Sequence, residues 1–136
     1  MELRFNENWN DYLIYGLDFS YVKKNRKIFE MGLERFYKEI KGSGALVYQA
    51  HPFRTGNVVR SAEFLHGIEI NNGGCYLDNA NDLARQYAQV NNLPGIGGGD
   101  FHGAGDEGRG GIIVQNRITT VSELLEVLIN SRYEVE

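Results

Sequence analysis

The sequence has few of the features that mark secreted, membrane-spanning or nucleic-acid-binding proteins. Its 136 residues include one cysteine, Cys75, which excludes an internal disulfide framework and favours a reducing, cytoplasmic compartment. No apolar run approaches the ~20 residues of a membrane span, and the polar first ten residues lack the apolar core of a signal peptide. The 14 basic residues form no block and are outnumbered by 18 acidic ones, which argues against a nucleic-acid backbone as partner.

Glycine, by contrast, is abundant, and it concentrates between Gly95 and Gly111. Glycine-rich segments inside compact α/β domains often mark tight turns at functional sites. The hydrophobic share of 42% and the charged share of 24% are those of an ordinary globular chain. The length suits a single domain, so we expect residues 1–136 to form one unit.

The hydrophobic pattern alternates short apolar strands with helices. Strands are expected at 2–5, 12–15, 45–49, 67–70, 96–100, 111–114 and 132–135. Helices are expected at 25–41, 57–65, 79–90 and 120–129, the last with a capping box of Thr120 and Glu123. This order is typical of a parallel α/β sheet, either open or barrel-like. Sites in such folds lie at the C-terminal ends of strands.

Asp100 and His102 are the strongest chemical candidates. They lie two residues apart at a predicted strand end, so both side chains can reach one ion. A carboxylate with an imidazole suits zinc, iron or manganese. The alternative is a glycine-rich turn in which Asp100 caps the backbone and His102 lies in solvent.

His51 follows another apolar strand, which Pro52 ends because proline cannot continue the ladder. We expect His51 to bind the same metal ion as Asp100 and His102. The alternative is a histidine whose ring is hydrogen-bonded to the backbone at the end of the strand. Glu69 stands between two isoleucines, and a buried acid needs a partner. A supporting role, holding a ligand or a loop amide, suits it better than direct metal binding. His66 precedes the strand and is assigned no role.

Arg54 and Arg109 lie within a few residues of the proposed ligands and are candidate phosphate-binding residues, with solvated arginines as the alternative. Other reaction classes fit poorly. The glycine-rich stretch lacks the Gly-Lys-Ser/Thr ending of a P-loop, and the sequence has no Gly-x-Ser-x-Gly nucleophile elbow.

Three segments resemble the later motifs of the PHP (polymerase and histidinol phosphatase) family. They are the Ala-His-Pro segment at 50–53, the Ile-Glu-Ile-Asn-Asn strand at 67–72 and the Gly-Asp-x-His segment at 94–102, with Gly99 where serine is usual. The resemblance implies a distorted (β/α)7 TIM-like barrel with a multinuclear metal site that hydrolyses phosphoesters. It also makes Glu2 a metal ligand and places Asp11 where a ligand histidine often stands.

The family's first motif, His-x-His, has no counterpart in the sequence. By the resemblance, residues 1–136 correspond to the C-terminal two-thirds to three-quarters of the barrel. A partial barrel would expose an edge, so we expect a homo-oligomer or another partner to cover it.

The leading hypothesis from these residues is a phosphoesterase. A divalent zinc, manganese or iron ion held by His51, Asp100, His102 and Glu2 would act on a small phosphorylated substrate, with Arg54 and Arg109 offsetting charge. The first alternative is a non-catalytic PHP-like interaction or regulatory module. The second is a small open α/β domain that binds an anion at its glycine-rich loop without metal.

Overall fold

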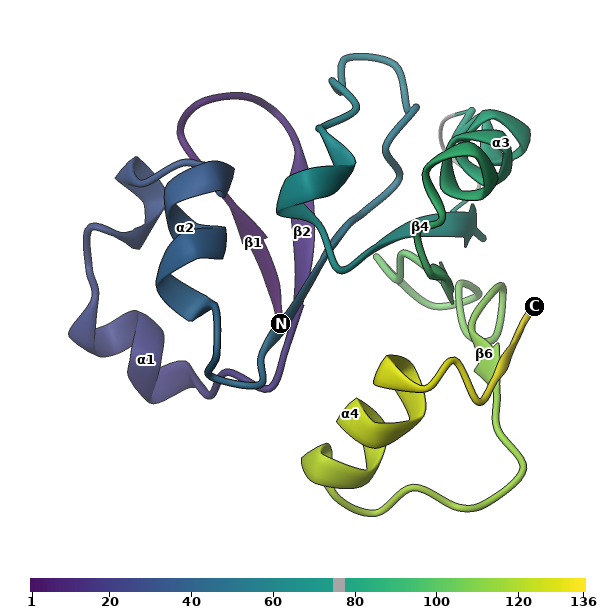
Figure 1. The fold of residues 1–136 in the computed structure, drawn as a ribbon. Coiled ribbons are helices and arrows are strands. Elements are labelled where there is room, and N and C mark those ends of the chain that lie inside the picture. Colours follow the sequence, from purple (N-terminus) through teal and green to yellow (C-terminus); the bar gives the residue numbers. More distant parts are fainter. Residues whose placement is uncertain (75–77) are drawn as a thin grey trace.

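The computed structural model describes residues 1–74 and 78–136, so Cys75, for which no chemical role is expected, lies outside the described residues. Its main element is a five-stranded mixed sheet with strands in chain order (Figure 1). The strands are β1 (Glu2–Arg4), β2 (Asp11–Tyr15), β3 (Leu46–Gln49), β4 (Gly67–Asn72) and β5 (Gly95–Gly98). A separate antiparallel pair consists of β6 (Ile112–Ile113) and β7 (Glu134–Val135).

The helices are short. They are α1 (Phe19–Lys24), η1 (Ile28–Glu30), α2 (Leu33–Ile40), η2 (Ala62–Phe64), α3 (Asn81–Asn91) and α4 (Val121–Ile129). The predicted capping box at α4 is confirmed: the Thr120 hydroxyl accepts the Glu123 N–H, and the Glu123 carboxylate accepts the Thr120 N–H. None of the described helices has the length and apolar content required to cross a membrane.

The expected partial (β/α)7 TIM-like barrel is wrong. Only β3, β4 and β5 run parallel, whereas β2 runs antiparallel to both β1 and β3. The connection from β3 to β4 carries a single 3-10 turn, η2, instead of a covering α-helix. Within 1–74 and 78–136 the strands therefore form an open mixed sheet and no closed barrel. The expectation of a partner at an edge stays a prediction.

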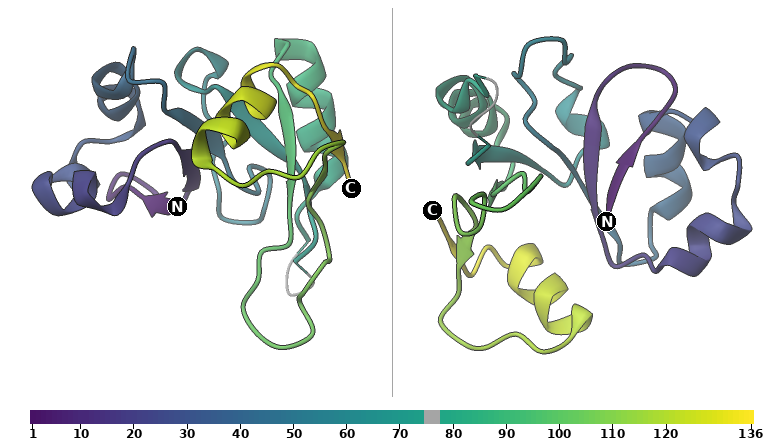
Figure 2. Two further views of the ribbon diagram at one scale, coloured as in Figure 1. Left: turned by 90° about the horizontal axis from the view of Figure 1, so that it is seen from below. Right: turned by 180° about the vertical axis from the view of Figure 1, so that it is seen from behind.

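The core lies on both faces of the sheet because strand side chains alternate between them. One face packs against α2 through Leu33, Phe36 and Ile40, which meet Tyr12 and Ile14 of β2. On the other face, Leu128 of α4 packs with residues of β3 and β5, namely Leu46, Tyr48 and Ile96. Figure 2 shows α2 and α4 on different sides of the strands. The cleft described below opens on the α4 face.

Two predicted helices differ from the structure. The helix expected at 25–41 is broken at Gly32, whose φ of +73° is incompatible with a continuous helix, so only its second half forms α2. The helix expected at 57–65 is reduced to η2. In addition, α1 was not expected. It begins because Asp18 caps the N–H groups of Ser20 and Tyr21.

Candidate metal centre

A cleft of about 290 Å³ lies at the C-terminal ends of β3, β4 and β5, where parallel α/β sheets carry their sites. All four residues predicted as metal ligands line it: Glu2, His51, Asp100 and His102. They come from three separate parts of the sequence, since only Asp100 and His102 are neighbours, so the topology of the sheet brings them together. The remaining lining residues are Leu13, Tyr15, Ala50, Glu69, Asn72, Gly97, Gly98, Gly99 and Phe101.

Glu2, Asp11 and His51 form a compact group of potential ligand atoms, and Glu2 and His51 of this group line the cleft. The Nε2 atom of His51 lies 3.8 Å from Glu2 Oε1 and 3.7 Å from Asp11 Oδ2. One ligand atom from each residue falls within 4.8 Å of the other two, which is compact enough for a shared cation. Asp11, which sequence reasoning placed only at the position of a missing histidine, therefore belongs to this group.

Strand register explains how these side chains meet. Glu2 pairs with Leu13 across the β1–β2 ladder, and Arg4 pairs with Asp11, so alternation puts Glu2 and Asp11 on the same face of the sheet. Because β2 runs antiparallel to β3, its first residue lies beside the end of β3. His51 follows that end directly.

His51 is fixed by its backbone and by its neighbours. Its φ is +25°, an uncommon conformation for a non-glycine residue, and such strain is often found at functional sites. Its N–H donates to Glu69 Oε2 at 2.7 Å. The Asn57 amide contacts both Nδ1 and the carbonyl oxygen of His51 at 3.0 Å. A metal at Nε2 requires the ring proton on Nδ1, and Asn57 would then have to turn its oxygen toward it.

Glu69 supports this arrangement from beneath the cleft. It is 3% exposed and accepts a second hydrogen bond from Asn72 Nδ2 at 3.0 Å. Burial raises the pKa of Glu69, against the opposing effect of these hydrogen bonds. A Cβ at Gly98 would collide with Glu69 Oε1, so glycine is what lets β5 approach this carboxyl group. Glu69 therefore positions the His51 backbone.

Asp100 and His102 are the other two predicted ligands that line the cleft. Asp100 has a φ of +47°, and Arg54 donates to its Oδ2. Burial tends to raise the pKa of Asp100, but the hydrogen bond and charge of Arg54 outweigh it and lower the pKa. His102 Nδ1 is hydrogen-bonded to the Asp100 carbonyl oxygen at 2.8 Å and lies 3.6 Å from its Oδ1. These contacts, the backbone bond first, raise the pKa of His102.

The two predicted phosphate-binding arginines occupy different places. Arg54 is not among the residues that line the cleft, but it donates both to Asp100, which does, and to Asn79 Oδ1 at 2.7 Å, so its guanidinium links three loops. Arg109 does not line the cleft either and has no contact with the proposed ligands' carboxylates among those described. It donates to the Gly105 carbonyl at 2.8 Å and lies 3.5 Å from Asp106. Phosphate contacts by either arginine stay predictions.

Asp106 and Arg4 are the residues that sequence reasoning missed. Asp106 is 3% exposed and accepts the N–H groups of His102 and Gly103 at 3.1 Å, which closes the loop after β5. An aspartate four residues after His102 in a glycine-rich loop could have suggested this turn. Arg4 binds Asp11, and only the hairpin register reveals that pairing.

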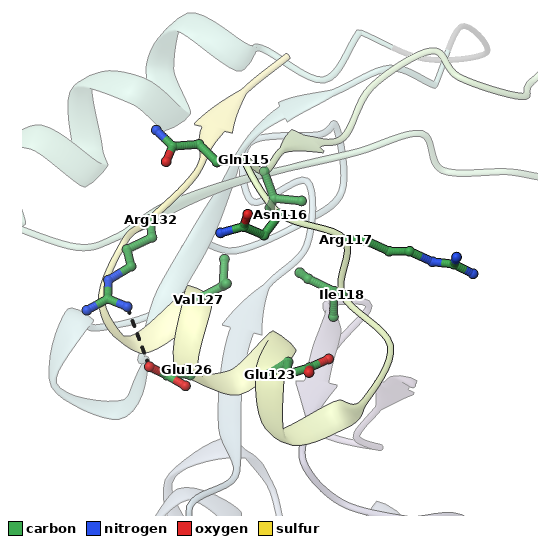
Figure 3. A pocket seen from close by; sticks show the side chains of 9 residues that line it. Gln115, Asn116, Arg117, Ile118, Glu123, Glu126, Val127 and Arg132 are labelled. Atoms are coloured by element: carbon green, nitrogen blue, oxygen red, sulfur yellow. Dashed lines mark hydrogen bonds and ion pairs between the residues drawn. The ribbon is translucent and has the colours of Figure 1, made fainter.

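A second hollow of about 280 Å³ lies between residues 114–118 and α4 (Figure 3). It contains none of the predicted site residues. Arg132 at its edge is paired with Glu126 at 3.5 Å, and the Arg117 guanidinium points away from the cavity in Figure 3. The cleft at the strand ends therefore remains the candidate site.

Carboxylates and imidazoles that converge at the strand ends of an α/β sheet define a candidate metal-binding domain. The donor set fits zinc, manganese or iron, because it combines hard oxygen ligands with imidazole nitrogen. Residues 78–133 match the family model described as PHP-associated, which confirms the resemblance to PHP proteins for this part of the chain. The match includes Asp100 and His102, whereas Glu2, Asp11 and His51 lie outside it. No curated protein and no solved structure matches the chain.

Proposed function

We propose that this chain carries a metal-dependent phosphoesterase site that acts on a small phosphorylated substrate. The observation that carries the proposal is the convergence of Glu2, His51, Asp100 and His102 on one cleft, with Asp11 grouped beside Glu2 and His51. The PHP-associated region, which contains Asp100 and His102, supports the same assignment.

The residues have distinct roles in this proposal. Glu2, Asp11 and His51 would hold a divalent ion, with Asp100 and His102 completing its surroundings. Such an ion supplies a water of lowered pKa and offsets charge on phosphoryl oxygens. Arg54 acts as a positioning residue, since its bond to Asp100 fixes a carboxylate that lines the cleft. The volume of about 290 Å³ suits a small phosphomonoester.

Hydrolysis of p-nitrophenyl phosphate, with zinc, manganese or iron added in turn to chelator-treated protein, tests the proposal. We expect metal-dependent turnover that falls at least about 100-fold in His51→Gln, since even the residues that merely orient a ligand contribute 10–100-fold. His66→Gln is the matched control, because His66 lies outside the cleft and its Nδ1 accepts the Val47 N–H. Turnover that needs no metal, or that survives in His51→Gln, would refute the assignment.

The second candidate function is a non-catalytic PHP-like module. The observation that favours it is that two of the proposed ligands are already paired with arginines: Arg4 forms an ion pair with Asp11, and Arg54 forms one with Asp100. A folded wild-type chain that shows no metal-dependent turnover in the same assay would support this alternative.

A further inference from the structure

Arg4 makes the most complete side-chain ion pair in the cleft region. Its Nε donates to Asp11 Oδ1 at 2.7 Å and its Nη2 donates to Asp11 Oδ2 at 2.6 Å, so the guanidinium engages both carboxylate oxygens. This two-pronged geometry is the strong form of an arginine–carboxylate pair. The oxygen that faces His51 Nε2 at 3.7 Å, Asp11 Oδ2, is one of the two that Arg4 holds. A metal and Arg4 therefore need the same ligand atom.

The two partners differ in their freedom to move. The side chain of Asp11 is 13% exposed at the start of β2, whereas that of Arg4 is 49% exposed. The Arg4 guanidinium carbon also lies 5.7 Å from the centre of the Trp9 ring, which is itself 71% exposed. Arginine can stack on this ring when it leaves a carboxylate. Arg4 is therefore the side chain of this pair that can move away from the other.

We propose that Arg4 is a built-in competitor for the metal. It occupies Asp11 when the cleft is empty, and a cation that takes Asp11 drives the guanidinium outward along Trp9. This inference rests on the proposed function, since it assumes that Glu2, Asp11 and His51 hold a cation.

The competition has a direct consequence for affinity. While Arg4 holds Asp11, the group offers a cation only Glu2 and His51, and the positive guanidinium adjacent to them repels it. Removing the guanidinium frees the third ligand and one negative charge. The metal should then bind more tightly. The substitution also removes the Arg4–Asp11 ion pair, but the Arg4 side chain is half-exposed, so this pair contributes little to the stability of the fold.

Zinc affinity, measured against a competing chelating indicator, tests this on wild type, Arg4→Gln and Arg4→Lys. We expect Arg4→Gln to bind zinc about tenfold more tightly, which corresponds to the loss of ~1.4 kcal/mol of competing interaction. Arg4→Lys should fall between them, because lysine keeps the charge but not the paired donors. Arg132→Gln is the control for charge. Arg132 does not line the cleft and pairs with Glu126, so the variant loses an equal charge and should bind zinc like wild type.

Two further measurements identify the mechanism. In an Asp11→Asn background, adding Arg4→Gln should change zinc affinity little, because the contested ligand is gone. Trp9 is the only tryptophan, so its emission reports on the adjacent guanidinium. Zinc should change that emission in wild type, with a midpoint equal to the measured affinity, and should have little effect in Arg4→Gln.

The outcomes separate the two proposals. If wild type and Arg4→Gln bind zinc equally, or if Arg4→Gln binds it more weakly, the competition is overturned and the metal site stands. If neither binds zinc, nor manganese or iron in the same measurement, both the competition and the proposed function fail. Tighter binding by Arg4→Gln that persists in the Asp11→Asn background would also overturn the inference, because the gain would then be independent of the contested ligand.

Discussion

Removing the carboxyl group of Glu69 should destabilise the fold and loosen the metal site together. In Glu69→Ala, two donors lose their acceptor: the His51 N–H at 2.7 Å and the Asn72 Nδ2 at 3.0 Å. Asn72 cannot turn its oxygen toward the gap without loss, because that oxygen already accepts bonds from the Gly74 N–H and the Asn79 amide, each at 2.8 Å.

The magnitude follows from these contacts. Each unsatisfied buried donor costs about 1–3 kcal/mol. The substitution also removes a buried carboxyl group, and that burial is itself unfavourable, as the raised pKa of Glu69 indicates. This gain offsets part of the loss in stability. The net loss in Glu69→Ala should be about 3 kcal/mol, or roughly 10 °C in Tm for a chain of this size. In Glu69→Gln the amide oxygen can replace Oε2, which accepts both bonds, so both are kept but neither has a charged acceptor, and a loss of about 1 kcal/mol is expected.

Thermal and urea unfolding of metal-free wild type, Glu69→Gln and Glu69→Ala measure this series directly. Zinc affinity measured on the same proteins should fall in the same order, because the positive φ of His51 depends on the Glu69 contact. Equal stability of all three proteins would refute the reasoning. So would a Glu69→Gln variant as unstable as Glu69→Ala.

Three other changes follow from the structure. Gly98→Ala should destabilise the fold by about 1–3 kcal/mol in chemical denaturation, since the new methyl group collides with Glu69 and overpacks β5; an unchanged midpoint would contradict this. Thr120→Ala should cost about 1 kcal/mol in the same assay by removing the cap of α4, and Thr120→Ser should restore most of it. Asp106→Ala should weaken zinc binding by roughly tenfold or more, because the His102 N–H loses its acceptor and the loop opens; wild-type affinity in this variant would contradict that role.

The local elements were largely predictable from the sequence. The strand expected before His51 is β3, which ends at Gln49, and the strand expected to end near Asp100 is β5, which ends at Gly98; the start of α4 followed from its capping box. The helix expected across Gly32 failed because hydrophobic periodicity does not register a glycine with positive φ. Local patterns thus predicted where elements lie, but not every interruption within them.

The global topology was less accessible. The barrel was inferred from strand–helix alternation and from the resemblance, yet the hairpin of β1 and β2 joins the sheet antiparallel to β3. That same hairpin explains why Asp11 and Arg4 were underrated. Their proximity to His51 depends on strand register, which no motif or spacing in the sequence encodes.

The metal content of purified protein, by elemental analysis after exposure to zinc, manganese or iron and removal of excess metal, tests the central claim most directly. We predict about one equivalent or more in wild type and in His66→Gln, and a large loss in His51→Gln, whose ring faces Glu2 and Asp11. Metal-free wild type, or a His51→Gln variant that retains the wild-type amount, would contradict the assignment of this cleft as a metal centre.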